Sequence, residues 1–356
     1  MNGSDLRTVA QQRQAQVDGV LDRFFSLAKN RAESFGVEYV ELWNALEANT
    51  TGGKRFRPRM VFSAYEALGG KDLEAAAYVG AAFELLHTAL IVHDDVIDHD
   101  FSRRGIPNIS GIYRTRALLR GAKQDVAEHN GISAAVIAGD LALFNASRLI
   151  ERSGVDFLTR QRLLDVVDDA LFASAAGELI DVDFSISVEM PRVDEILMME
   201  RYKTAVYSFE CPLQAGAILA GGSDEVVATL GDFGREIGIA YQIVDDLLGV
   251  FGEEAETGKT TIGDLREGKR TVLISYVTST AEWSQIEPLI GKPDLTEDEA
   301  AFVREVLISS GARSFAQGLA RYYANRALAR LAEPHVPAAL RTELHPVADA
   351  VLGRVK

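Results

Sequence analysis

The sequence predicts an all-α protein, folded as a helical bundle around a cavity, from three observations. Apolar residues recur at helical spacing almost everywhere, as in Val17, Leu21 and Phe24 near the N-terminus. The alternation of apolar and polar residues that is typical of strands is nearly absent. No proline lies between Pro107 and Pro191, so long helices can run unbroken through the middle of the chain.

Glycine-containing breaks divide this helical pattern into segments. Gly121, Gly131 and the pair Ser153-Gly154 are the expected breaks in mid-chain, and the charged, glycine-bearing stretch 251–269 predicts a loop. No repeat or low-complexity tract is present, which disfavours a solenoid. A chain of this length could hold two fused halves, but we take residues 1–356 as a single all-helical domain. The predicted helices cover 5–30, 36–49, 54–69, 72–99, 111–121, 132–153, 156–185, 192–221, 223–251, 270–282, 296–310, 312–332 and 336–354.

Charge and composition exclude some classes of function. The formal net charge of -15 argues against a nucleic-acid partner, because such proteins normally present a basic face. An anionic substrate would need local Lys/Arg clusters or bound cations. The single cysteine, Cys211, allows no intramolecular disulfide, and the polar N-terminus lacks a signal-peptide core. We expect a cytoplasmic location. The apolar stretch 75–92 is interrupted by Glu84 and His87, which favours a buried core helix over a membrane span.

The first candidate site is the segment HDDVID, at the end of this apolar helix. Asp94, Asp95 and Asp98 lie within one helical turn of each other, so their carboxylates can converge. Carboxylates are the ligands that Mg²⁺ prefers, often together with substrate phosphates. The alternative is a solvated acidic helix end, although acids favour helix N-termini rather than C-termini.

A second acidic segment, YQIVDDLLG, has the same design. Asp245 and Asp246 again follow an apolar helical run, and Gln242 lies one turn upstream on the same helix face. Two such helix ends facing each other across a bundle cavity can hold metal ions between them. The pair therefore favours a magnesium-diphosphate site over two chance clusters.

Basic clusters accompany the acids. The segment GGKRFRP opens a helix with Lys54 and Arg57, and Arg103 and Arg104 follow the first acidic motif. Backbone amides at a helix start and guanidinium groups both bind phosphate oxygens. Either cluster alone would be read as solvated surface charge, but acids and bases alternating along one chain predict diphosphate binding.

Five further residues are candidates on weaker signals. Lys203 with Thr204, and Lys259 and Lys269 in the charged loop, could reach a diphosphate, and the loop itself could close over it as a lid. His87 lies two turns before the first acids on the same face, either as a ligand or as a core histidine satisfied by a neighbour.

The chain resembles the trans-isoprenyl diphosphate synthases of the polyprenyl synthetase family, over residues 50–280. The motifs GGKRFRP, HTALIVHDDVID with RRG after it, KTA, YQIVDDLLG and GKTTIGDLREGK occur in the family's order and approximate spacing. The resemblance implies the type I isoprenoid synthase bundle, a homodimer, and the condensation of isopentenyl diphosphate with an allylic diphosphate.

The resemblance also implies a role for each candidate residue. The Mg²⁺ ligands would be Asp94, Asp95, Asp98, Asp245 and Asp246. Contacts with the allylic diphosphate would come from Arg103, Lys203, Lys259 and Lys269. Isopentenyl diphosphate would be held by Lys54, Arg57, His87 and Arg104. Thr204 and Gln242 would lie close to the developing allylic cation. Metal ions and basic residues would stabilise the departing pyrophosphate, which would then accept the proton, so no Ser-His-Asp arrangement is needed.

Two positions carry finer expectations. Gly249 stands where many relatives have a third aspartate, so metal binding at the second motif would rely on Asp245, Asp246 and water. Ala89, five positions before Asp94, leaves room where short-chain relatives carry an aromatic plug. A chain-length pocket of Ala89, Leu90 and Leu86 thus predicts geranylgeranyl diphosphate or a longer product.

Three alternatives remain open at this point. A class I terpene cyclase shares the fold, but it would not require the second diphosphate site that GGKRFRP supplies. A non-catalytic partner subunit would be expected to lose an acid pair or the RRG cluster, and this chain keeps both. A purely structural helical protein would have no reason to place acids beside apolar runs twice.

Overall fold

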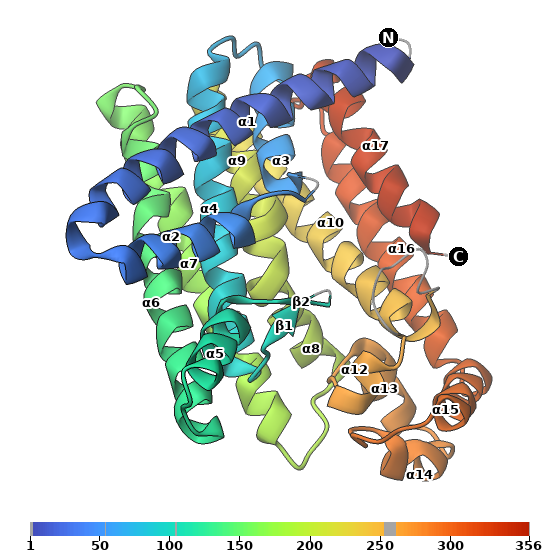
Figure 1. Ribbon diagram of the computed structural model, residues 1–356. Coiled ribbons are helices and arrows are strands. Elements are labelled where there is room, and N and C mark those ends of the chain that lie inside the picture. The colour runs from blue at the N-terminus through green and yellow to red at the C-terminus, as the bar shows by residue number, and fades with distance from the viewer. Residues whose placement is uncertain (1–2, 54, 104, 253–260, 356) are drawn as a thin grey trace. The chain divides into compact units, whose positions relative to one another are not determined.

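The computed structural model describes residues 3–53, 55–103, 105–252 and 261–355 (Figure 1). The described chain is helical almost throughout, which confirms the predicted all-α class. Its two strands are β1 (Ser102–Arg103) and β2 (Ile106–Pro107), which pair as a short antiparallel hairpin. Residue contacts divide the chain into two compact units, which are described separately below.

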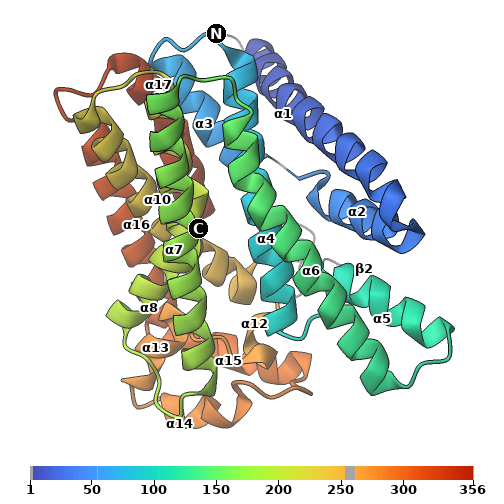
Figure 2. The same ribbon diagram turned by 90° about the vertical axis from the view of Figure 1, so that its left-hand side faces the viewer.

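Unit 1 comprises residues 1–171 and 211–227 and is organised around one buried helix. This helix, α4, packs against α6, α3 and α1 (Figure 2), and most of its apolar residues are buried. Burying this apolar length is the main stabilising term of the unit. The helices of unit 1 are α1 (Gly3–Ala32), the 3-10 turn Glu33–Phe35, α2 (Val37–Thr50), α3 (Phe56–Ala67), α4 (Leu73–Ile97), α5 (Ile109–Leu119), α6 (Gln124–Glu151), the first half of α7 (Phe157–Ile186) and α9 (Cys211–Leu219).

Unit 2 comprises residues 172–210 and 228–356. Its α16 packs against α17, α13 and α15 through fully buried alanines, small side chains that allow close helix approach. Its elements are the second half of α7, α8 (Val193–Glu200), the π-helix Arg201–Glu210, α10 (Asp224–Phe251, which begins in unit 1), α12 (Gly263–Glu267), α13 (Val272–Thr278), α14 (Trp283–Ile286), the 3-10 turn Glu287–Leu289, α15 (Glu297–Ser309), α16 (Ala312–Leu331) and α17 (Ala338–Arg354).

The glycines predicted to break helices have two different roles. Gly121 and Gly154 adopt φ of 88° and 78° just past helix ends, as predicted. Gly131 does not end a helix, because α6 runs through it. A Cβ at Gly131 would lie 2.3 Å from the carbonyl oxygen of Ser110, so this glycine lets α5 approach α6.

The helix predicted over 192–221 is three pieces instead of one. A ten-residue π-helix, Arg201–Glu210, separates α8 from α9. Such i→i+5 stretches are rare and are frequent at functional sites. Pro212, two residues after the π-helix ends, has no N–H to donate, so the regular helical ladder is interrupted at this point.

Two helices of the described residues, α4 and α6, are long and apolar enough to cross a membrane by length and composition alone. In α4, 78% of the apolar window is buried inside the protein, as the sequence predicts for a core helix. In α6 the buried share is 39%, so much of its apolar surface is exposed.

Candidate active site

The first acidic motif ends α4. His99 adopts a left-handed backbone with φ of 57°, and the N–H of Asp100 donates to the carbonyl of Asp95, which closes the helix with a Schellman arrangement. Asp94 and Asp95 lie in the last turn, and Asp98 is the exposed C-cap residue. The three acids therefore sit together at one helix end, as predicted.

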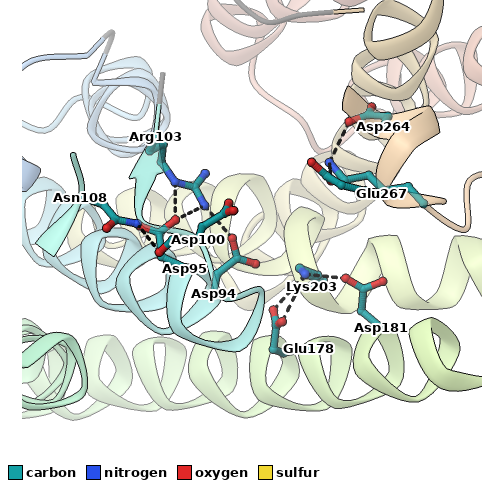
Figure 3. A network of polar contacts seen from close by, with 11 residues as sticks. Asp94, Asp95, Asp100, Arg103, Asn108, Glu178, Asp181, Lys203, Asp264 and Glu267 are labelled. Carbon is teal, nitrogen blue, oxygen red and sulfur yellow. Dashed lines mark hydrogen bonds and ion pairs between the residues drawn. The ribbon is translucent and has the colours of Figure 1, made fainter. Parts of the chain in front are cut away.

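Arg103 on β1 forms ion pairs with two of these acids (Figure 3). Its Nη2 lies 2.8 Å from Asp94 Oδ2 and 2.7 Å from Asp95 Oδ1. Burial raises the pKa of Asp95, and the guanidinium only partly offsets this. Burial works to lower the pKa of Arg103, but Asp95 and Asp94 outweigh it and raise the value. Arg103, which is predicted to contact diphosphate, thus partly neutralises two of the acids that are predicted to bind Mg²⁺.

The basic segment before α3 is organised by Arg55, which the sequence did not single out. Its side chain is 6% exposed and its backbone is left-handed, with φ of 45°. Its Nε donates to Asp18 Oδ1 at 2.8 Å, and its Nη1 donates to the carbonyl of Thr50 at 2.8 Å and to Glu84 Oε2 at 3.1 Å. Arg55 therefore links α1, the end of α2 and α4 to the start of α3.

Arg57 lies in the first turn of α3 and shares the same acid. Its Nη1 is 3.9 Å from Glu84 Oε1, and its side chain is 13% exposed. His87 lies three residues after Glu84, hence on the same face of α4. Arg57 and His87, two of the predicted isopentenyl diphosphate ligands, thus lie at the face of α4 that carries Glu84. The other two, Lys54 and Arg104, lie outside the described residues.

One of the predicted chain-length residues, Leu86, lines a cavity in unit 1. Leu86 contributes to a cavity of about 290 Å³ between α4, α6 and α7. Ala89 is fully buried one turn after Leu86 on the same face, and Leu90 is half-buried. The remaining lining residues come from α6 and α7: Leu143, Ser147, Leu164, Asp165, Val167, Asp168 and Leu171.

The second acidic motif lies near the end of α10. Asp246 is buried and accepts a hydrogen bond from Gln242 Nε2 at 3.0 Å, whereas Asp245 is part-exposed and lies 3.8 Å from Arg354 Nη2. Burial raises the pKa of Asp246 to about 7. The Gln242 hydrogen bond opposes this rise, and the charge of Asp264 adds to it. The two acids therefore have different environments.

Lys203 and Thr204 lie on the π-helix. Lys203 Nζ is 2.6 Å from Asp181 Oδ2 and 3.1 Å from Glu178 Oε2, both on α7 (Figure 3). A Cβ at Gly177 would lie 2.2 Å from the backbone nitrogen of Lys203, so glycine permits this close approach. Sequence reasoning missed these two acids, although their spacing of three residues on one helix face was a usable signal.

Lys269 follows α12 and is paired with an acid of that helix. Its Nζ lies 2.8 Å from Asp264 Oδ1 and 3.4 Å from Glu267 Oε2. Burial works to lower the pKa of Lys269, but these two carboxylates outweigh it and raise the value. Lys259 lies outside the described residues. The described part of the predicted loop 251–269 thus contains a short helix.

Glu200, at the end of α8, is the most deeply buried acid near the second motif. It is 2% exposed, and neither carboxylate oxygen has a hydrogen-bond donor among the described residues. Burial raises its pKa well above the usual range, and the charges of Asp246 and Asp181 add to this. No sequence pattern singles out Glu200, which reads as an ordinary helical acid.

The donor set of both units fits a divalent cation. Mg²⁺ takes oxygen ligands and is commonly held by one or two carboxylates together with substrate phosphates. Asp94 and Asp95 share a single cation, the Arg103 guanidinium. Asp246 lies beside a second buried acid, Glu200. In the described part of the chain, no three or more His, Cys, Asp or Glu side chains form a preformed metal cluster. The carboxylate pairs would hold such an ion together with phosphate and water.

The sequence matches the family model described as polyprenyl synthetase over residues 40–307. It is 31% identical over 345 residues to a geranylfarnesyl diphosphate synthase of Aeropyrum pernix, which covers 96% of this chain and 99% of that protein. It is 34% identical over 227 residues to a geranylgeranyl diphosphate synthase of Sulfolobus acidocaldarius, covering 63% of each chain.

The fold is similar to that of a solved relative. A crystal structure of geranylgeranyl pyrophosphate synthase from Corynebacterium glutamicum, complexed with isoprenyl diphosphate and magnesium, aligns with a TM-score of 0.87 at 29% identity. The alignment covers 96% of this chain and 98% of that one. The type I isoprenoid synthase bundle expected from the sequence motifs is therefore confirmed.

Proposed function

The chain belongs to the polyprenyl synthetase family, and we propose the residues, metal and assembly with which it carries out the family's reaction. It is a trans-prenyltransferase, and enzymes of this kind condense isopentenyl diphosphate with an allylic diphosphate. The product class that its relatives support is geranylgeranyl diphosphate or longer. The terpene cyclase alternative is not favoured, because the similar proteins are prenyl diphosphate synthases.

The observation that supports our assignment of roles is that a predicted diphosphate-binding cation is paired with an acid in each unit. In unit 1, Arg103 lies on Asp94 and Asp95, and in unit 2, Lys269 lies on Asp264. A metal-bound diphosphate would bring negative phosphate oxygens to these cations, and the metal ion would neutralise the acids in their place. We propose that each cation then donates to the diphosphate instead.

We propose Mg²⁺ as the metal, held by the predicted carboxylates. The family uses a divalent cation. When bound, Mg²⁺ stabilises negative charge on the leaving pyrophosphate as a Lewis acid. The proposed ligands are Asp94, Asp95, Asp98, Asp245 and Asp246.

The reaction follows from the charges that the chain supplies. The allylic carbon–oxygen bond breaks and its electron pair leaves with pyrophosphate, while Arg103 and Lys203 donate hydrogen bonds to the departing oxygens. The isopentenyl double bond attacks the allylic carbon, and the resulting cation loses a proton to pyrophosphate. Thr204 and Gln242 present uncharged polar groups to the developing cation.

We propose that the second diphosphate binds at the start of α3. Arg57 is pre-positioned there by its contact with Glu84, and His87 lies on the same face of α4. A planar guanidinium suits bidentate binding of phosphate oxygens. Lys54 and Arg104 belong to this set by resemblance to the family.

Product length would be set by the cavity beside α4. Leu86 lines it, and the small, fully buried Ala89 lies one turn closer to the acids. An apolar chain growing from the acids along this face would reach the cavity past Ala89 and Leu90. We therefore propose geranylgeranyl diphosphate or a longer product.

We propose that the protein is a homodimer without a membrane span, located in the cytoplasm, an environment that the single buried Cys211 suits. The exposed apolar residues Val126, Ile137 and Phe144 lie on one line along α6, because they are spaced by eleven and seven residues. A second copy covering this stripe would remove it from water. Phe144→Glu should give a monomer in light scattering, whereas Leu27→Glu on α1 should not; a dimer that survives Phe144→Glu would exclude this face.

The enzymatic proposal is tested by product analysis. Purified protein is incubated with Mg²⁺, labelled isopentenyl diphosphate and, separately, the C5, C10 and C15 allylic diphosphates, and the dephosphorylated products are sized by chromatography. We expect linear prenyl alcohols of twenty carbons or more. Products that stop at fifteen carbons would contradict the proposed length, and replacement of Mg²⁺ by a chelator should abolish elongation.

A further inference from the structure

The second acidic motif of this chain is one carboxylate shorter than the first. In the first motif, Asp98 follows Asp94 by four residues, which is one helical turn. The position four residues after Asp245 is Gly249. Gly249 shares a face of α10 with Gln242 and Asp246, so the face that carries the second acids ends in a residue without a side chain.

A carboxylate from another element occupies the space that Gly249 leaves. A Cβ built on Gly249 would lie 2.0 Å from Oδ2 of Asp264, and 3.0 Å from its Cγ. No real Cβ can approach an oxygen so closely, so any larger residue at 249 would force the Asp264 side chain to move. Asp264 can therefore lie against this face of α10 only because residue 249 is glycine.

An ion pair with Lys269 also holds Asp264 in that position. Its Oδ1 is bonded to Lys269 Nζ at 2.8 Å, which leaves Oδ2 on the side of Gly249. Asp246 lies three residues before Gly249, hence on the same face of α10. Asp264 therefore lies beside the turn of α10 that follows Asp245 and Asp246.

A second observation indicates that this group of acids takes a cation. Glu200 is 2% exposed, lies beside Asp246, and has no hydrogen-bond donor for either carboxylate oxygen among the described residues. A buried carboxylate without a donor is costly unless a proton or a cation compensates it. A divalent cation bound beside Asp246 would supply that compensation.

We propose that Asp264 supplies the third carboxylate of the second metal site, in the place that Gly249 leaves open beside Asp245 and Asp246, and that the ligand is a divalent cation bound together with a diphosphate. The inference rests on the proposed function of the second motif. It also replaces the expectation that water completes that motif. In this chain the third acid comes from α12 rather than from the next turn of α10.

The test uses metal binding as its readout. Binding of Mn²⁺ to the full chain in the presence of inorganic pyrophosphate is titrated by calorimetry, and the unfolding temperature is followed as a function of Mn²⁺. Asp264→Asn keeps a hydrogen-bond acceptor for Lys269, and its apparent Mn²⁺ affinity should fall by about tenfold or more. Gly249→Ala should lower the apparent Mn²⁺ affinity by a similar factor, because its methyl group displaces the same carboxylate without altering any charge.

The matched control is Glu267→Gln. Glu267 lies on the same short helix and also contacts Lys269, but it is 62% exposed and does not lie against Gly249. Its apparent Mn²⁺ affinity should change less than about twofold, as an exposed acid outside the metal's ligand shell should. A fall equal to that of Asp264→Asn would show that release of Lys269, not loss of a ligand, weakens binding.

A swap of the carboxylate gives the sharpest outcome. The double variant Gly249→Asp/Asp264→Ala moves the acid from α12 to α10, and it should recover most of the affinity that Asp264→Ala alone loses. The inference is overturned if Asp264→Asn binds Mn²⁺ as the unmodified protein does while Asp246→Asn does not. Failure of the unmodified protein to bind Mn²⁺ with pyrophosphate would instead count against the proposed function itself.

Discussion

Replacing Arg55 by methionine removes the residue that joins three helices to the start of α3. The side chain is 6% exposed and donates to Asp18, to the Thr50 carbonyl and to Glu84. Methionine keeps much of the volume but none of the donors. Glu84 would then remain buried with Arg57, 3.9 Å away, as its nearest cation among the contacts described above.

The size of the effect follows from these contacts. Removing one partner of a buried ion pair costs about 3–5 kcal/mol, because the other charge stays buried. Asp18 is 37% exposed and can be rehydrated, so it adds little to this loss. We expect Arg55→Met to lower the free energy of unfolding by about 3–5 kcal/mol, a large part of the roughly 5–15 kcal/mol of a typical domain.

Urea unfolding followed by circular dichroism measures this change. Arg59→Met is the matched control, because Arg59 is exposed on the same helix and should change stability by less than about 0.5 kcal/mol. Arg55→Met/Glu84→Leu should be less damaging than the sum of its single changes, since the buried acid leaves with its partner. A loss below about 1 kcal/mol for Arg55→Met, or strict additivity in the double variant, would refute the reasoning.

Three further predictions concern the product, packing and pH. Ala89→Phe should shorten the product seen by chromatography, because the ring would fill the fully buried face that leads to the cavity; unchanged length would exclude Ala89 from the pocket. Gly131→Ala should cost about 1–3 kcal/mol in urea unfolding, since its methyl would meet a carbonyl 2.3 Å away, whereas Gly318→Ala, with open space, should stabilise by up to about 1 kcal/mol; equal effects would contradict the close contact. Burial raises the pKa of Glu236 above its ordinary 4.5, although the charge of Arg326 opposes this. The folded protein therefore binds this proton more tightly than the unfolded chain does. The resulting stabilisation is fully present below about pH 4.5 and is lost as pH rises through the raised pKa. Glu236→Gln should therefore gain stability relative to the unmodified protein above about pH 4.5, and parallel pH profiles would count against it.

The features of the fold that the sequence predicts correctly are those carried by local chemistry. Helical spacing of apolar residues locates the long helices, and Gly121 and Gly154 mark helix ends because only glycine adopts their backbone angles without strain. Gly131 carries the same local signal with a different cause. Its place inside α6 depends on the carbonyl of Ser110 in a neighbouring helix, which no local pattern encodes.

The candidate site divides in the same way. Short spacing along one helix is enough to group Asp94 with Asp95 and Asp245 with Asp246. The partners of these groups come from distant parts of the chain, as in Asp264 against Gly249, and are fixed by packing. Sequence patterns therefore indicate the chemistry of the site, whereas the neighbours that tune it emerge only in the folded structure.

The central claim is that the chain joins two diphosphate substrates, and the stoichiometry of pyrophosphate release tests it most directly. Pyrophosphate is measured with Mg²⁺ and an allylic diphosphate, first without and then with isopentenyl diphosphate. We expect release only when isopentenyl diphosphate is present, with one pyrophosphate freed for each isopentenyl unit incorporated. Rapid release from the allylic diphosphate alone, accompanied by a cyclic hydrocarbon, would contradict it.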